Sequence, residues 1–125
     1  MGWLNSESFA SVFGLRPQLF ADYRAFEEAV WRDGQLGPRL LELCRARVAQ
    51  ILGDGTAEDV AALTECERAC LRLTDKFVLD PHGVGDADAA AVAKHLSPAA
   101  MVALIEALAL FDGFTRFRLI LGVED

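Results

Sequence analysis

The sequence ELCRARVAQILG, residues 42–53, makes up most of a predicted helix near the middle of this 125-residue chain. Pro38 suits the first turn of a helix and Gly53 suits the position just after its end, so we expect the helix to run between them. Apolar residues recur along one face at a spacing of three or four, as they do in an amphipathic helix: Leu41, Cys44, Val48 and Ile51. The tight acidic turn Gly53-Asp54-Gly55-Thr56 follows this segment.

Helical spacing continues towards the N-terminus. Asn5 or Ser6 is a candidate cap for a short segment that ends at Gly14. Pro17 then begins a longer helix, which Asp33-Gly34 ends. The apolar face of this second helix is predicted to comprise four residues: Leu19, Tyr23, Phe26 and Val30.

Helical signals also continue towards the C-terminus. Thr56 is expected to cap a short helix over residues 57–63, and Thr64 forms a capping box with Glu67 for a helix that reaches about Val78. A loop rich in Pro and Gly over residues 79–85 follows. Two further helices are expected after this loop: Asp86 to Leu96, capped by Asp86, and Pro98 to about Gly122. Because no strand alternation or repeat is visible, the sequence predicts an all-α bundle of six or seven helices.

Composition limits the possible classes of protein. The length fits one domain over residues 1–125, and 53% of the residues are hydrophobic. Twelve Lys and Arg against nineteen Asp and Glu give a net charge of −7, so neither nucleic acid nor a membrane is an expected partner. The first eight residues lack a charged start followed by an apolar run, and three cysteines suit a reducing compartment. We therefore expect a cytoplasmic protein.

The last predicted helix is apolar around most of its circumference from Ala99 to Phe111. Such a helix is typical of the centre of a bundle or of a contact between subunits. Glu106 lies in the middle of this run, and a buried carboxylate needs a partner. Arg116, Arg118 or an arginine of another helix could serve as that partner, but a charge at a packed helix edge is the simpler interpretation.

Two segments carry a resemblance to a known family. Residues 42–53 resemble the helix that precedes the active site in the carboxymuconolactone decarboxylase and alkylhydroperoxidase D-like (AhpD-like) family, whose pattern E-L-x-x-x-R-V-A leads to a glycine, C-x-x-C and a histidine. Residues 112–116, DGFTR, are similar to the family's N-x-aromatic-N-R segment. The resemblance covers about residues 17–124 and implies an AhpD-like helical bundle.

The chain departs from the family at the reactive positions. Residues Asp54 to Ala57 follow Gly53, so the C-x-x-C pair and the histidine of the family have no counterpart. The two family asparagines are replaced by Asp112 and Thr115. Of the family's catalytic set, Glu42 matches the proton-relay glutamate. The resemblance therefore implies a degenerate member in which peroxide reduction by the family's mechanism is not expected.

The chain's own cysteines do not replace the missing pair. Cys66 and Cys70 lie one helical turn apart on a stripe that Leu73 and Phe77 continue, and Cys44 lies on the stripe of its own helix. We interpret all three as core residues, because buried apolar thiols are unreactive and two cysteines at this spacing are poorly placed for a disulfide. The two histidines, His82 and His95, show no metal-ligand spacing, so neither a metal nor a cofactor is expected.

Glu42 is the remaining candidate for catalysis. Arg45 is three residues away, and a surface ion pair between the two is the simpler interpretation. The alternative is a pocket of the family kind. Its candidate lining residues are Ala46, Ala49, Asp112, Thr115 and Arg116.

Three functions follow from the sequence. The first is a redox-silent protein that binds a small apolar molecule or assembles with copies of itself. The second is an acid/base enzyme of the lactone decarboxylase kind that uses Glu42, and the missing family histidine counts against it. The third is a thiol oxidoreductase that uses Cys44, Cys66 or Cys70. We predict the first, with a dimer or larger homo-oligomer as the assembly.

Overall fold

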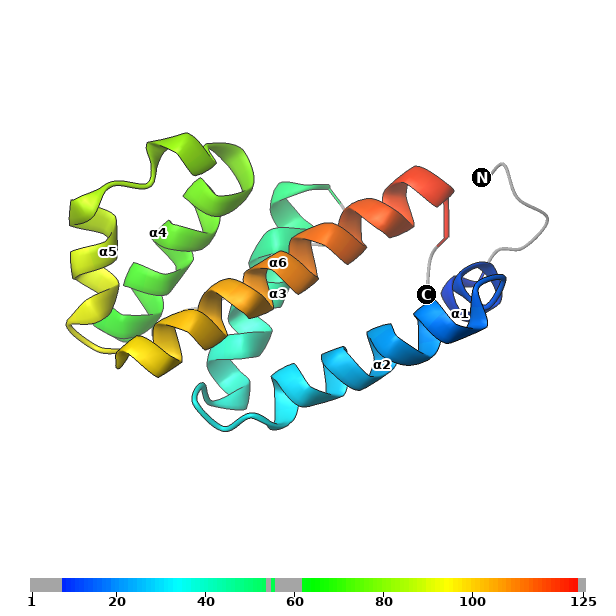
Figure 1. The fold of residues 1–125 in the computed structure, drawn as a ribbon. Coiled ribbons are helices and arrows are strands. Elements are labelled where there is room, and N and C mark those ends of the chain that lie inside the picture. Colours follow the sequence, from blue (N-terminus) through cyan, green and yellow to red (C-terminus); the bar gives the residue numbers. More distant parts are fainter. Residues whose placement is uncertain (1–7, 54, 56–61, 124–125) are drawn as a thin grey trace.

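The computed structural model describes residues 8–53, 55 and 62–123 (Figure 1). These residues contain six α-helices and a 3-10 turn, and no strand is found among them, which confirms the all-α prediction. The elements are α1 (Phe9–Phe13), α2 (Pro17–Arg32), α3 (Pro38–Ile51), α4 (Glu65–Leu79), the turn η1 (Pro81–Gly83), α5 (Asp86–Ala93) and α6 (Pro98–Leu121). The cap predicted at Asn5 or Ser6 lies outside the described residues. So does most of the helix predicted over residues 57–63, whose last two residues are not helical.

Local capping signals set most helix ends. The Thr64 hydroxyl accepts a hydrogen bond from the Glu67 amide at 3.1 Å, and the Glu67 carboxylate accepts one from the Thr64 amide at 2.9 Å, so the predicted capping box is confirmed. Gly53 and Gly122 have positive φ values of 80° and 69°, just past α3 and α6. Only glycine adopts this backbone conformation without strain, which explains why both helices end there.

The prediction for α5 was wrong at both ends. Gly85, not Asp86, is the capping residue, because the Asp88 carboxylate accepts a hydrogen bond from the Gly85 amide at 2.9 Å. The regular helix stops at Ala93, and the chain continues to Leu96 in a turn.

Helix α3 lies at the centre of the bundle, packed against α4 and α6 (Figure 1). Arg47 of α3 donates two hydrogen bonds to Asp75 of α4, at 2.6 and 2.8 Å, and this paired geometry fixes the two helices against each other. Helix α5 packs on α4, and α1 packs on α2 at the opposite end of the molecule. The bundle therefore has two ends, and α3 and α6 connect them.

The core is formed mainly by α3, α4 and α6. Its largest fully buried apolar side chains include Leu41, Val48, Leu104 and Leu108. At the α1 end, aromatic rings fill the space between α1, α2 and the last turns of α6: Phe9, Phe13, Phe20, Tyr23, Phe114 and Phe117. Two members of this aromatic cluster, Tyr23 and Phe114, line the site described below.

The predicted apolar face of α2 is only partly correct. Tyr23 is buried, but the side chains of Leu19 and Phe26 are 54% and 41% exposed. The inward side instead carries Phe20 and Trp31, which pack against the core. Because α2 lies at the edge of the bundle, part of its apolar surface faces outward.

Helix α6 is apolar on both its inner and outer sides. Leu104 and Leu108 are buried, whereas Val102 and Ile105 are exposed. The Glu106 side chain is exposed on this outer side, so it is not a buried carboxylate that needs a partner. By length and composition alone, α6 is long and apolar enough to cross a membrane. The core helix of a soluble protein passes the same test, and 39% of the most apolar stretch of α6 is buried in this structure.

Candidate functional site

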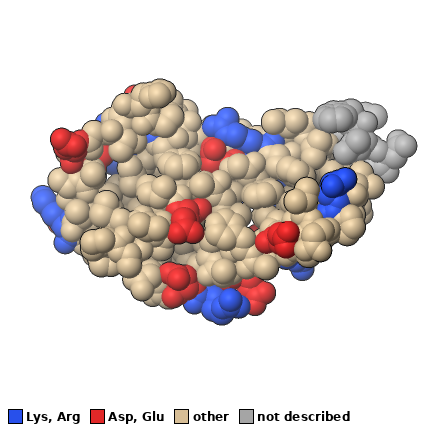
Figure 2. Space-filling model, in the orientation of Figure 1, with Lys and Arg blue, Asp and Glu red and all other residues tan. Residues whose placement is uncertain are grey.

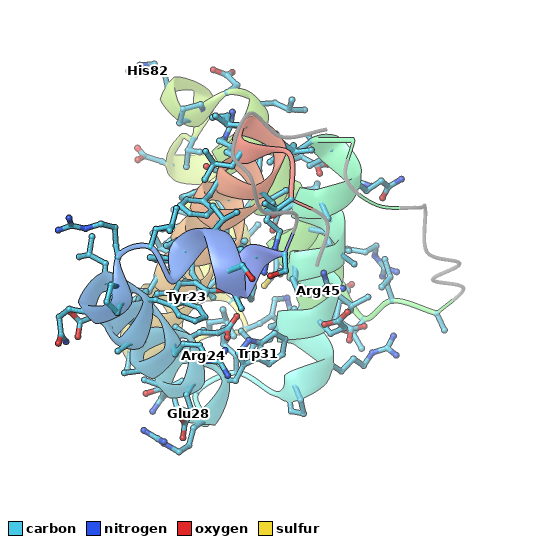
Figure 3. The ribbon with its side chains drawn as sticks, turned by 90° about the vertical axis from the view of Figure 1, so that its right-hand side faces the viewer. Tyr23, Arg24, Glu28, Trp31, Arg45 and His82 are labelled. Carbon is cyan, nitrogen blue, oxygen red and sulfur yellow. The ribbon has the colours of Figure 1, made fainter. Side chains whose placement is uncertain are left out.

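A pocket of about 320 Å³ opens between α2, α3 and α6. Side chains from all three helices form its walls: Tyr23, Glu27, Trp31, Arg45, Ala49, Leu110, Phe111, Phe114, Thr115 and Arg118. Figure 3 shows Tyr23, Trp31 and Arg45 turned towards the space between α2 and α3, whereas Glu28 lies on the outer side of α2. One part of the wall is aromatic and another part carries charged groups, a combination typical of binding sites for small molecules.

The charged groups of this pocket form a hydrogen-bonded network. The Tyr23 hydroxyl donates to the Glu27 carboxylate at 2.8 Å. Burial and this bond to Glu27 raise the pKa of Tyr23 to about 12, and the nearby Arg118 guanidinium opposes the shift. Arg118 stacks over the ring of Phe9 at 4.1 Å and donates to the Phe114 carbonyl at 3.5 Å. Tyr23 is therefore a neutral hydrogen-bonding group at neutral pH.

Arg45 connects the pocket to the candidate catalytic residue. Its guanidinium forms two hydrogen bonds to the Glu42 carboxylate, the Nε bond being 2.9 Å long. The pair lies at the surface, with side chains 45% and 47% exposed for Arg45 and Glu42. The Arg45 guanidinium also holds the pKa of Glu42 below its ordinary value. Glu42 is thus an ionised, ion-paired carboxylate at neutral pH.

The structure brings together some of the residues predicted for a pocket. Ala49 and Thr115 line it, whereas Glu42, Ala46, Asp112 and Arg116 are not among its lining residues. Asp112 and Arg116 instead pair with each other one turn apart on α6, at 2.9 Å.

Sequence reasoning missed the contribution of α2 to this pocket. Tyr23, Glu27 and Trp31 follow each other at intervals of four residues, so they occupy one face of the helix. This spacing could have predicted the wall, but a charged residue such as Glu27 does not count towards an apolar face.

A larger pocket of about 440 Å³ lies between the end of α2 and the start of α6. Its walls are mostly aliphatic, and its ionisable groups, Asp33 and Glu106, are both acidic. We prefer the smaller pocket as the functional site, because its aromatic walls and its donors and acceptors converge on one space.

The three cysteines lie elsewhere, between α3 and α4. Cys44 and Cys70 are buried and Cys66 is half-buried, and all are free thiols. Burial raises the pKa of Cys44 to about 11. Burial and the neighbouring thiols raise the pKa of Cys70 to about 12. In the described part of the chain, no group of three His, Cys, Asp or Glu side chains is placed to hold a metal ion.

Comparison with known proteins identifies the fold. No protein-family model and no curated protein matches the sequence. The structure is similar to a crystal structure from Agrobacterium tumefaciens of a protein of unknown function, which has been proposed to be an antioxidant defence protein AhpD. The TM-score is 0.79 at 21% sequence identity, over 98% of this chain and 96% of that chain. The chain therefore has an AhpD-like helical fold.

Proposed function

We propose that this chain is a redox-silent protein of the AhpD-like fold that binds a small, largely apolar molecule between α2, α3 and α6. The observation that carries the proposal is the pocket itself, which combines aromatic walls with a Tyr23–Glu27 hydrogen bond and two guanidinium groups. The sequence contains no C-x-x-C pair, and the cysteines it does have lie outside the pocket. Binding, rather than thiol chemistry, is the function that these residues support.

The chemistry of the pocket limits its ligand. Trp31, Phe111 and Phe114 offer flat apolar surface on which a ring packs well. The Glu27 carboxylate accepts hydrogen bonds, and the two arginines donate them. The volume lies at the lower end of the range for small-molecule sites. We therefore propose an aromatic or alicyclic molecule with one polar edge.

Filling the pocket is expected to abolish binding of a neutral apolar probe. N-phenyl-1-naphthylamine, whose fluorescence rises in an apolar site, tests this directly. Ala49→Leu adds three carbon atoms to the pocket wall and is expected to weaken probe binding at least about tenfold, because overfilled sites exclude ligand. A fluorescence titration of the wild type and the variant measures the change.

A matched substitution separates the two pockets. Ala99 is an exposed residue that lines the larger pocket, so Ala99→Leu applies the same change there. We expect it to leave probe affinity within about twofold of wild type, the scale of an ordinary surface substitution. Loss of binding in Ala99→Leu with retention in Ala49→Leu would move the site to the larger pocket. Circular dichroism confirms that both variants fold.

We also propose that the chain assembles with copies of itself through the outer side of α6. Exposed apolar residues extend along this helix: Val102, Ile105, Leu119 and Ile120. Figure 2 shows that residues without charge form most of the surface over α6. Monomeric proteins rarely leave large apolar patches in water, and a symmetric contact lets the same face cover itself.

A charge on this face is expected to dissociate the assembly. Ile105→Glu places a carboxylate next to Glu106 on the outer side of α6, and burial of both charges in a contact is unfavourable. Light scattering after size exclusion is expected to give a multiple of 13.6 kDa for the wild type and 13.6 kDa for the variant. Leu79→Glu, on the exposed end of α4, is the control that should retain the wild-type mass. A 13.6 kDa wild type would contradict self-assembly.

A further inference from the structure

Three cations of this acidic protein lie in one groove of the described structure. At least half of the twelve Lys and Arg residues form ion pairs among the described residues: Arg32, Arg39, Arg45, Arg47, Lys76 and Arg116. In the described structure, Arg68, Arg72 and Lys94 form no ion pair, yet all three line the same groove between α4 and α5. His95 lies beside them, and the groove has a volume of about 300 Å³.

The backbone places these cations on facing walls. Arg68 and Arg72 are one turn apart on α4, so they project from the same side of that helix. Lys94 and His95 follow the last residue of α5. Two alanines, Ala69 and Ala91, line the space between them and leave it open. The side chains of Arg68, Arg72, Lys94 and His95 are all exposed at the rim.

The nearby acids do not neutralise the groove. Glu65 is the one acidic residue among its lining residues. Asp88 also feels the charge of Arg72, but its carboxylate already accepts from Lys76 at 2.8 Å and from the Gly85 amide at 2.9 Å. Like charges one turn apart destabilise a helix, and this chain has a net charge of −7. A group of cations that form no ion pair with the described residues is therefore unexpected unless an anion occupies the groove.

We propose that the groove between α4 and α5 binds a small molecule bearing at least two phosphate or carboxylate groups. Arg72 offers paired guanidinium donors to an oxyanion, and Lys94 offers a point charge from the opposite wall. Arg68 offers its remaining N–H groups, since its Nη1 donates to the Leu63 carbonyl at 2.7 Å. The walls supply little apolar surface, which distinguishes this groove from the aromatic pocket at the other side of α3. The site is independent of the small-molecule pocket proposed above.

Pyrophosphate and citrate are the probes, titrated separately by calorimetry at low salt. Arg72→Gln combined with Lys94→Gln removes two charges from the groove, and neither residue forms an ion pair among the described residues. The control combines Arg16→Gln with Arg24→Gln, at the N-terminal end of α2 and within it, away from α4 and α5 (Figure 1). It gives the chain the same net charge as the groove variant. We expect affinity at least about tenfold lower in the groove variant and within about threefold of wild type in the control, since screened charges act over about 10 Å.

A third variant tests whether the loss of a negative charge from the groove increases its affinity for the probes. Glu65→Gln removes the acid that lines the groove, so it is expected to tighten binding. The probe that binds more tightly identifies the phosphate or the carboxylate as the preferred group. An equal loss of affinity in the groove variant and the control would show that binding responds to net charge alone, and would overturn the proposed site. Absence of binding of both probes at millimolar concentration to the folded wild type would also overturn it.

Discussion

Leu108→Ala is expected to lower the free energy of unfolding by about 2–5 kcal/mol, the usual range for a leucine removed from a packed core. Leu108 has no exposed surface and lies on the inner side of α6, within the core that α3 and α4 complete. The loss combines the transfer of the side chain from water with the cavity left behind. Denaturation in urea, followed by circular dichroism, measures the change.

Leu79→Ala provides a matched control, because it makes the same chemical change at a side chain that is 70% exposed. It is expected to alter the free energy of unfolding by less than about 1 kcal/mol. A similar small effect for Leu108→Ala would mean that α6 does not pack inside the bundle, and the arrangement of α3, α4 and α6 would then be wrong.

The sequence predicted the bounds of α3 and the start of α4 correctly because the signals for them are local, although both ends of α5 were wrong. Pro38 and Gly53 bound α3, and Thr64 with Glu67 begins α4, through contacts within four residues of chain. The same periodicity did not predict which side of an edge helix faces the core. Apolar spacing includes Leu19 in the face of α2, but the neighbours that would cover Leu19 are set by packing between helices, which no local pattern records.

Glu106 shows a related limit. Its apolar neighbours in sequence allow either a buried carboxylate or a charge at a helix edge, and it lies on the side of α6 that the bundle does not cover. A helix that is apolar all round has no pattern from which its inner side can be identified. The contact partners of α6 decide the burial of Glu106.

The candidate pocket was predictable only in part. Ala49 and Thr115 were named from the resemblance of their segments to a known family, and both line the pocket. The wall from α2 was missed, because Glu27 interrupts what would otherwise be an aromatic stripe with Tyr23 and Trp31. The hydrogen bond from the Tyr23 hydroxyl to the Glu27 carboxylate explains why Glu27 lies on this face. A charged residue on an apolar face indicates a site only when its partner is known.

Native Cys44 and Cys70 are expected to react with a chromogenic disulfide far more slowly than an ordinary thiol. The thiolate is the reactive form, and its share at neutral pH falls tenfold for each unit by which the pKa rises. Burial raises the pKa from 9.0 to about 11 for Cys44 and to about 12 for Cys70. Thiolate supply alone therefore slows these two thiols on the order of 100-fold or more, and burial of both sulfur atoms slows them further.

Cys66→Ser isolates these two thiols, since Cys66 is the cysteine that is only half-buried. In this variant we expect almost no colour change under native conditions, a rate that increases as the pH rises towards 11, and immediate reaction of both thiols in guanidinium chloride. The unfolded sample is the control for reagent and thiol content. Rapid native reaction of either thiol would restore a thiol oxidoreductase as the better hypothesis. Slow reaction would support the redox-silent function proposed above, since the pocket between α2, α3 and α6 contains no cysteine.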